Sequence, residues 1–194
     1  MKPIVVGLLS DTHIPYRLPR LPQEVIDAFE GVDVILHAGD VDVPQALTPL
    51  RRIAPVHAVR GNVHVTDFSD GGAEFPAEVR LELAGVRIVL THAHQPGLLG
   101  FVAKGFHVVQ YWLGLTDNER LNRLIVPRLV RAYPEADVIV FGHSHAAHVE
   151  WVDGTLLINP GAVSSSRGEE PTVARMTLGE GRPKVEFVSL SDVG

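Results

Sequence analysis

Three histidines lie within six residues in the last third of the chain. The segment VIVFGHSHAAH (138–148) passes from an apolar stretch straight into Gly142-His143-Ser144-His145. Burial of an imidazole without a partner costs free energy. Side chains two residues apart on an extended backbone point to the same side, so His143 and His145 are predicted to face a common ligand.

Four earlier apolar stretches end in polar clusters of the same kind. In open α/β sheets, ligand sites gather just beyond the carboxyl ends of the strands, so the five clusters are predicted to converge. Asp11 and His13, again two residues apart, are predicted to share an extended segment. Glycines at 39, 61 and 142 should let the backbone turn sharply beside these groups. The four clusters are Ser10-Asp11-Thr12-His13, Ala38-Gly39-Asp40, Arg60-Gly61-Asn62 and Thr91-His92-Ala93-His94.

Together the clusters offer a set of oxygen and nitrogen donors typical of a metal centre. Seven donors exceed the needs of one tetrahedral zinc and suit two metal ions that share a carboxylate. Imidazole-rich sites favour manganese, iron, zinc, nickel or cobalt over magnesium or calcium. Two divalent ions with two carboxylates and a hydroxide carry a net charge of about +1, which attracts an anion such as a phosphate ester. The donors are Asp11, His13, Asp40, Asn62, His92, His143 and His145.

Alternating strand and helix patterns must position these donors. The first half of the chain alternates the two, and the second half is rich in hairpins, which predicts a mixed α/β sheet system flanked by helices. Helices are predicted at 22–30, 44–53 and 118–132. Strands are predicted at 4–9, 32–36, 56–59, 79–83, 86–90, 138–141, 149–152, 155–158, 172–178 and 185–190.

The composition is that of an ordinary soluble domain. The 194 residues, 45% apolar and 21% charged, predict a single domain over 1–194 with a longer helical segment at about 95–135. A net charge of −6 argues against a duplex nucleic acid partner, and the absence of cysteine excludes thiolate chemistry. The apolar run at 4–9 is too short for a signal peptide or a membrane span, so we expect a cytoplasmic protein without a membrane partner.

The five clusters in this order resemble the signature of the calcineurin-like metallophosphoesterase superfamily, which reads D-x-H, G-D, G-N, H and G-H-x-H. All five blocks stand between residues 11 and 145. His37 before Ala38-Gly39-Asp40, Arg60 before Gly61-Asn62, and Asn159-Pro160-Gly161 further resemble the short YfcE-type phosphodiesterases. The segment 11–17 is similar to the Vps29 branch, which holds protein partners on the same fold.

The resemblance implies a four-layer αββα sandwich of two mixed sheets, as in metallo-dependent phosphatases. It implies that Asp11, His13, Asp40 and His145 hold one metal. Asp40 would bridge to a second metal, held also by Asn62, His92 and His143. The implied reaction is hydrolysis of small phosphate diesters by attack of a metal-bound hydroxide, with two divalent ions, manganese first. The alternatives are a phosphomonoesterase, a dinucleoside polyphosphate hydrolase, or a Vps29-like binding scaffold.

The chain departs from the family pattern after the G-N block. Many relatives carry histidine there, but this chain has Val63 and then His64. His64 or His94 is therefore predicted to act beside Asn62 as the proton donor to the leaving group. Arg60 is predicted to meet the substrate phosphate, with a surface salt bridge as its alternative.

Two further features keep alternatives open. His37 is predicted to support a metal ligand or to pack in the core. The long connection at 95–136 is predicted to line a core or a subunit interface, which would make the protein a homo-oligomer. A lid over the metals is the alternative for the same segment.

Overall fold

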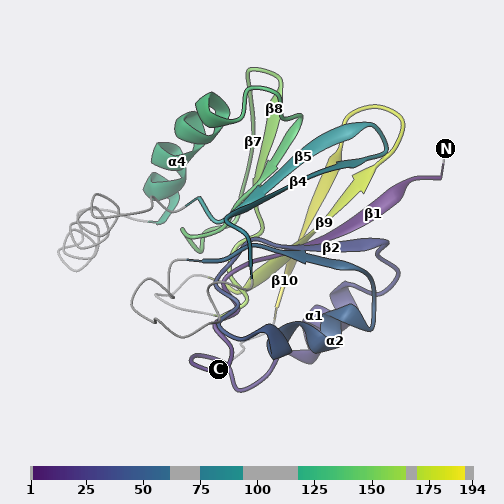
Figure 1. Cartoon of the computed structure of the whole chain (residues 1–194), viewed down its shortest axis with the longest axis vertical. Coiled ribbons are helices and arrows are strands. Elements are labelled where there is room, and N and C mark those ends of the chain that lie inside the picture. The colour runs from purple at the N-terminus through teal and green to yellow at the C-terminus, as the bar shows by residue number, and fades with distance from the viewer. Residues whose placement is uncertain (1, 62–74, 94–117, 165–169, 191–194) are drawn as a thin grey trace.

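The computed structural model describes residues 2–61, 75–93, 118–164 and 170–190 (Figure 1). Two five-stranded mixed sheets form the centre of this described part. The strands agree with the predicted ranges to within one or two residues.

The first sheet combines the amino-terminal strands with the carboxyl-terminal hairpin, in the order β10-β9-β1-β2-β3. β1, β2 and β3 run parallel, and β9 pairs antiparallel with β1 and β10. Its strands are β1 (Ile4–Leu9), β2 (Val34–His37), β3 (Val56–Ala58), β9 (Thr172–Leu178) and β10 (Lys184–Ser189).

The second sheet has the order β4-β5-β6-β8-β7. β5, β6 and β8 run parallel, and the edge strands β4 and β7 are joined to them as antiparallel hairpins. Its strands are β4 (Glu78–Leu83), β5 (Val86–Thr91), β6 (Val138–Val140), β7 (His148–Val152) and β8 (Thr155–Asn159).

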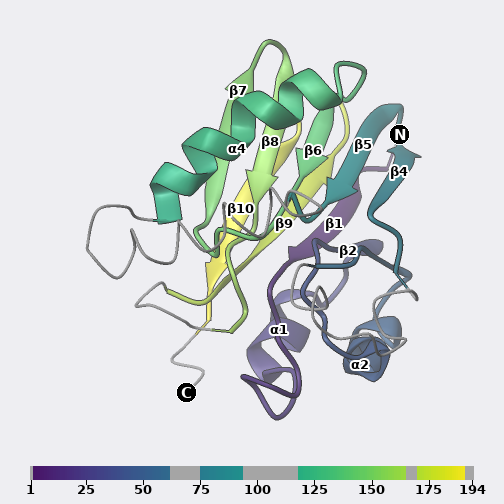
Figure 2. The same cartoon turned by 60° about the vertical axis from the view of Figure 1, so that its left-hand side comes forward.

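Three apolar layers hold the two sheets and the helices together. Val6 and Leu36 of the first sheet meet Leu90 of the second in the central layer. Phe29, beside the short helix α1 (Gln23–Ala28), belongs to a second layer on the outer face of the first sheet. α4 (Asn118–Ala132) covers the outer face of the second sheet, where Leu129 packs in the third layer (Figure 2). This αββα order confirms the predicted fold class.

The predicted helix at 44–53 is divided in two. The structure has a 3₁₀ helix η1 (Pro44–Leu47) followed by one α-helical turn, α2 (Thr48–Arg51). Pro49 has no backbone N–H, so a continuous α-helix would lack its bond to the carbonyl of Gln45. Of the predicted segment at 95–135, the part from Asn118 is helical as α4 and residues 95–117 lie outside the described residues. No helix in the described part of the chain is long and apolar enough to cross a bilayer.

Candidate metal centre

The loop after β1 is joined by backbone hydrogen bonds to the loop after β2. Asp11 N–H donates to the carbonyl of Gly39 and His13 N–H donates to the carbonyl of Asp40, both at 3.0 Å. Both donating residues lie in the left-handed region, with φ of 52° at Asp11 and 48° at His13. The two loops therefore turn together, and they carry their side chains into one space.

The prediction of extended ligand segments was wrong. His143 and His145 also have positive φ, 77° and 64°, and so does Asp40 at 57°. A left-handed residue costs an L-amino acid about 1–2 kcal/mol, so surrounding contacts must hold these turns in place. The side chains do converge, but through tight turns rather than through the alternation of a strand.

Asp40 lies at the centre of the converging side chains. Its Oδ2 atom is 3.4 Å from His13 Nε2 and 3.5 Å from His92 Nε2. Asp11 Oδ1 lies 3.2 Å from His145 Nε2 and 4.0 Å from His13 Nε2. Asp40 thus contacts one histidine from the loop after β1 and one from the loop after β5.

The histidines form two pairs around the aspartates. The rings of His13 and His145 stack with centroids 5.6 Å apart, and those of His92 and His143 meet edge to face at 5.2 Å. One pair includes a residue from the loop after β1, and the other a residue from the loop after β5. The structure therefore brings together six of the seven predicted donors, and the seventh, Asn62, lies outside the described residues.

The donor set fits divalent metal ions. Two groups have ligand atoms that all lie within 4.8 Å of one another: Asp11 with His13 and His145, and Asp11 with Asp40 and His92. His13 Nε2 is buried and makes no hydrogen bond with the described residues. A metal ligand needs a donor atom that is not engaged in another hydrogen bond, and His13 Nε2, which faces two carboxylates, meets this condition. By this distance criterion the residue common to both groups is Asp11, whereas the resemblance implied Asp40.

Burial and charge oppose each other at the two aspartates. Burial alone would raise the pKa of Asp11, but the His145 imidazole and the histidines beyond it hold that pKa well below its ordinary value. Burial would likewise raise the pKa of Asp40, but His92 lowers it. The same contact acts in reverse on His92, where burial would lower the pKa and the Asp40 carboxylate raises it to about 9. The metal-free centre therefore keeps both aspartates ionised and His92 protonated at neutral pH.

His37 supports the ligand loops by hydrogen bonds and belongs to neither group of candidate metal ligands. Its Nδ1 atom accepts the N–H of Gly39 at 3.2 Å, and its Nε2 atom lies 3.2 Å from Thr12 Oγ1. The Thr12 hydroxyl in turn donates to the carbonyl of Asp40 at 3.3 Å. Burial lowers the pKa of His37 to about 4, so the neutral ring donates through Nε2 and connects the two loops.

A second network fixes the loop that carries His143 and His145, and the sequence did not reveal it. Asn159, at the end of β8, donates to the carbonyl of Gly142 at 3.1 Å and to Ser144 Oγ at 2.8 Å. Ser144 donates to Asn122 of α4 at 2.6 Å, and Asn122 donates to the carbonyl of Ala146 at 3.1 Å. The amide residues Asn159, at a strand end, and Asn122, on a helix, are the only signal of this network in the sequence. These hydrogen-bond partners lie 15 to 24 residues away, so the sequence does not show which groups they bind.

Two glycines allow the loops to approach closely. A Cβ atom on Gly61 would overlap Asp40 Oδ1, and one on Gly142 would lie 2.8 Å from the carbonyl of Ala38 and 3.0 Å from Asp11 Oδ2. Neither residue has a positive φ. Glycine is therefore required at these two positions because any side chain would collide with the neighbouring loop. Of the three predicted sharp turns, only the one at Gly39 has a positive φ, of 99°.

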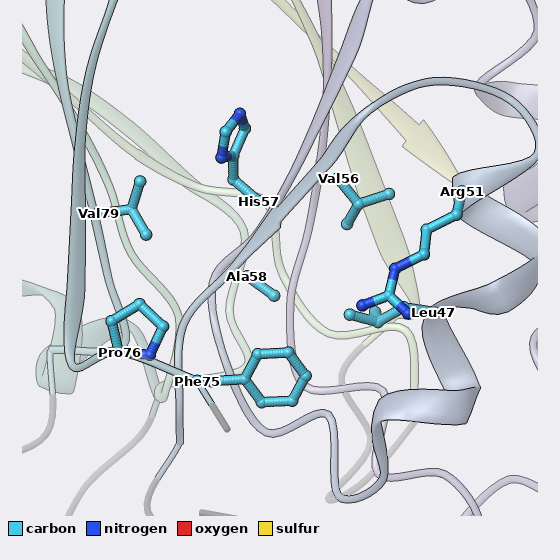
Figure 3. Close-up of a pocket in the computed structure, with 8 residues that line it drawn as sticks. All are labelled: Leu47, Arg51, Val56, His57, Ala58, Phe75, Pro76 and Val79. Carbon is cyan, nitrogen blue, oxygen red and sulfur yellow. The ribbon is translucent and has the colours of Figure 1, made fainter. Parts of the chain in front are cut away.

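The remaining predicted site residues are Arg60, His64 and His94. Arg60 is exposed, and its backbone N–H donates to the carbonyl of Pro76 at 2.9 Å. His64 and His94 lie outside the described residues. A separate cavity of about 330 Å³ opens where β3 and β4 face each other, and no metal-ligand candidate lines it (Figure 3). Its lining consists of Leu47, Arg51, Val56, His57, Ala58, Phe75, Pro76 and Val79.

Sequence comparison connects this arrangement with known proteins. The calcineurin-like phosphoesterase superfamily domain matches residues 4–181. A protein of Methanothermobacter thermautotrophicus described as a probable metallophosphoesterase is 32% identical over 170 residues, which are 88% of this chain and 83% of that protein.

Solved structures share the fold over almost the whole chain. Vps29 of Cryptosporidium parvum superposes with a TM-score of 0.62 at 21% identity, covering 98% of this chain and 99% of that one. A protein described as a novel archaeal phosphodiesterase gives a TM-score of 0.62 at 19% identity, covering 96% and 100%. At these identities the likeness shows the fold alone.

Gly61→Ala is expected to abolish metal uptake, because the added methyl group would displace the Asp40 carboxylate. Elemental analysis of purified protein after incubation with Mn²⁺ measures the bound ions. Gly179→Ala is the matched control, since its Cβ would meet Pro3 at an ordinary 3.5 Å. Normal metal content in Gly61→Ala would contradict the close approach.

Metal binding is expected to release a proton from His92 at pH 7. A ligand imidazole must be neutral, whereas the pKa of about 9 leaves His92 protonated before binding. Apparent metal affinity should therefore increase as the pH rises from 7 towards 9 and level off above it. Calorimetry in two buffers of different ionisation enthalpy counts the protons, and equal heats in both buffers would refute the assignment.

Proposed function

Since this chain belongs to the calcineurin-like phosphoesterase superfamily, we propose that it is a metal-dependent phosphodiesterase that hydrolyses small phosphate esters. The observation that supports this function is the position of Asp40, 3.4 Å from His13 and 3.5 Å from His92 in a buried site. A carboxylate so placed is suited to contact two cations at once.

Two divalent ions are the proposed cofactors, with manganese first and iron, zinc, nickel or cobalt as alternatives. Bound there, they would act as Lewis acids on the phosphoryl oxygens and lower the pKa of a coordinated water. In this proposal Asp40 is shared between two ligand sets. The first set is Asp11, His13 and His145, and the second is Asn62, His92 and His143.

Hydrogen bonding prepares His92 for its proposed role. Its Nδ1 atom lies 2.7 Å from the carbonyl of Ala38, which can only accept a hydrogen bond. The Nδ1 position therefore carries the proton, and the Nε2 lone pair of the neutral ring faces Asp40. This contact fixes the orientation of the ring, and it sets the tautomer that remains once the Nε2 proton has left.

Substrate contacts are proposed for residues at the rim. Arg60 is exposed beside Gly61, where its guanidinium can meet a substrate phosphate. His64 or His94, with Asn62, is proposed to act at the leaving group. A net charge of −6 argues against a basic channel for a nucleic acid chain, so the proposed substrates are small.

Two kinds of alternative are retained. A phosphomonoesterase or a dinucleoside polyphosphate hydrolase would use the same donors on a different ester. A binding scaffold is suggested by the likeness in fold to Vps29. A scaffold does not need a complete set of ligands, so the six donors that come together here favour the enzyme.

Asp40→Asn and His92→Ala are each expected to reduce hydrolysis of a bis(aryl) phosphate by about 10³-fold or more, because ion binding contributes several kcal/mol. Release of the aryl alcohol with added Mn²⁺ is the measurement. His148→Ala is the control, because His148 contacts Glu150 and Phe141 rather than the centre. Full activity in Asp40→Asn would exclude a shared aspartate, and an inactive wild type that still binds Mn²⁺ would favour the scaffold.

His64→Ala is expected to slow esters of poorly acidic alcohols by about 10²-fold or more and to spare esters of acidic phenols. A poor leaving group needs a proton in the transition state, and an acidic one does not. Rates across a series of aryl and alkyl leaving groups measure the dependence. An equal loss for every ester would argue against a proton donor at His64 and direct the test to His94.

A further inference from the structure

Asp42 is a buried carboxylate that the proposed reaction does not use. It follows β2 in the same loop as Asp40, and the residue is 4% exposed. Neither of its side-chain oxygens has a hydrogen-bond partner among the described residues. A buried side-chain oxygen without a hydrogen bond is destabilising, so a particular role must account for it.

Asp42 faces the imidazole of His13, which is a proposed metal ligand. His13 Nδ1 lies 3.5 Å from Asp42 Oδ1, and both side chains are almost fully buried. The other nitrogen of the same ring, Nε2, faces Asp40 at 3.4 Å. The imidazole therefore lies between the candidate metal centre and a carboxylate on its opposite side.

The backbone holds this pair in register. Ile14 and Asp42 form an isolated parallel bridge, and His13 N–H donates to the carbonyl of Asp40 at 3.0 Å. Asp42 is left-handed like His13, with φ of 69° and 48° respectively. These two turns direct the side chains of both residues towards each other, and the stacked ring of His145 limits how far His13 can tilt.

We propose that Asp42 is a positioning residue, whose carboxyl group faces Nδ1 of His13, favours the proton on that nitrogen and so presents Nε2 as the lone-pair atom of a metal ligand. The inference rests on the proposed function, because it assigns His13 to a metal. A carboxylate behind an imidazole fixes the tautomer and the orientation of the ring and makes it a stronger donor. At 3.5 Å the contact is an ion-pair distance, slightly longer than a normal N–H···O bond.

This role predicts opposite responses of stability and metal affinity. Neither side-chain oxygen of Asp42 has a hydrogen-bond partner among the described residues, so replacing this side chain should not weaken the fold of the protein without metal. In the loaded protein it supports one ligand, so its loss should weaken the ion that His13 holds. A residue that merely packed in the loop would lower stability and disturb both ions equally.

The test compares Asp42→Asn, which keeps the shape and removes the charge, with Asp42→Ala, which removes the acceptor. Zn²⁺ calorimetry should show one binding step weakened by about 10–100-fold in Asp42→Ala, less in Asp42→Asn, and the other step unchanged. In Zn²⁺-loaded wild type, ¹⁵N NMR should find the His13 proton on Nδ1, and in the alanine variant this proton should exchange faster with water. Melting of the metal-free variants should match that of the controls.

Asp153→Asn and Asp153→Ala are the matched controls, because Asp153 is also left-handed, with φ of 50°, but exposed in the turn between β7 and β8. Wild-type Zn²⁺ affinity in both Asp42 variants would overturn the inference, as would a fall in melting temperature with equal weakening of both steps. If Asp42→Ala does not fold, Asp42→Asn alone decides on the same criteria. A wild type that binds no Zn²⁺ would instead refute the proposed function.

Discussion

Two ionised aspartates lie side by side in the interior, and the structure depends on compensating them. Asp11 and Asp40 are 0% and 2% exposed, and the charge of Asp11 opposes ionisation of Asp40. Each carboxylate would cost several kcal/mol to bury alone, so cations or hydrogen-bond donors must surround it. The histidines supply this compensation in the metal-free protein, and His92 accepts a proton to do so. A site that must bind a proton to tolerate its own charge is well suited to exchange that proton for a metal ion.

The sandwich meets this requirement by joining the loops of both sheets around Asp11. From the second sheet, the backbone N–H of His143 donates a hydrogen bond of 3.2 Å to Asp11 Oδ2. On the other side, the hydroxyl of Ser164 donates to the carbonyl of Asp11 at 2.7 Å, and its N–H donates to the same atom at 3.2 Å. The ligand loop after β1 is thus held by segments that follow β6 and β8. The left-handed turns that direct the side chains inward persist because these contacts fix them.

The sequence was sufficient to predict the regular elements and the convergence of the donors. Alternating and continuous apolar runs report burial in strands, and the polar clusters at their ends follow from the parallel order. The turns were not predictable in the same way, because positive φ at Asp11 or His145 is imposed by partners far along the chain. Asn159 stood out only as part of the Asn159-Pro160-Gly161 motif, without its partners. The support from Asn122 and the carboxyl group of Asp42 were missed for the same reason. Each looks like an ordinary polar residue until the fold places its neighbour.

The span of chain between the bonded loops has a consequence for how the protein matures. Asp11 and His143 are 132 residues apart, and Asp11 and Ser164 are 153 residues apart. Contacts between residues so far apart in the sequence form late, because the entropic cost of closing a long loop arises before the contact adds any stability. The loop after β1 is therefore expected to gain these contacts only after β6 and β8 have formed. Ions that bind only the finished sandwich would add about 1.4 kcal/mol to its stability for each tenfold excess over their dissociation constant. The supply of such ions would then affect how long the folded protein persists.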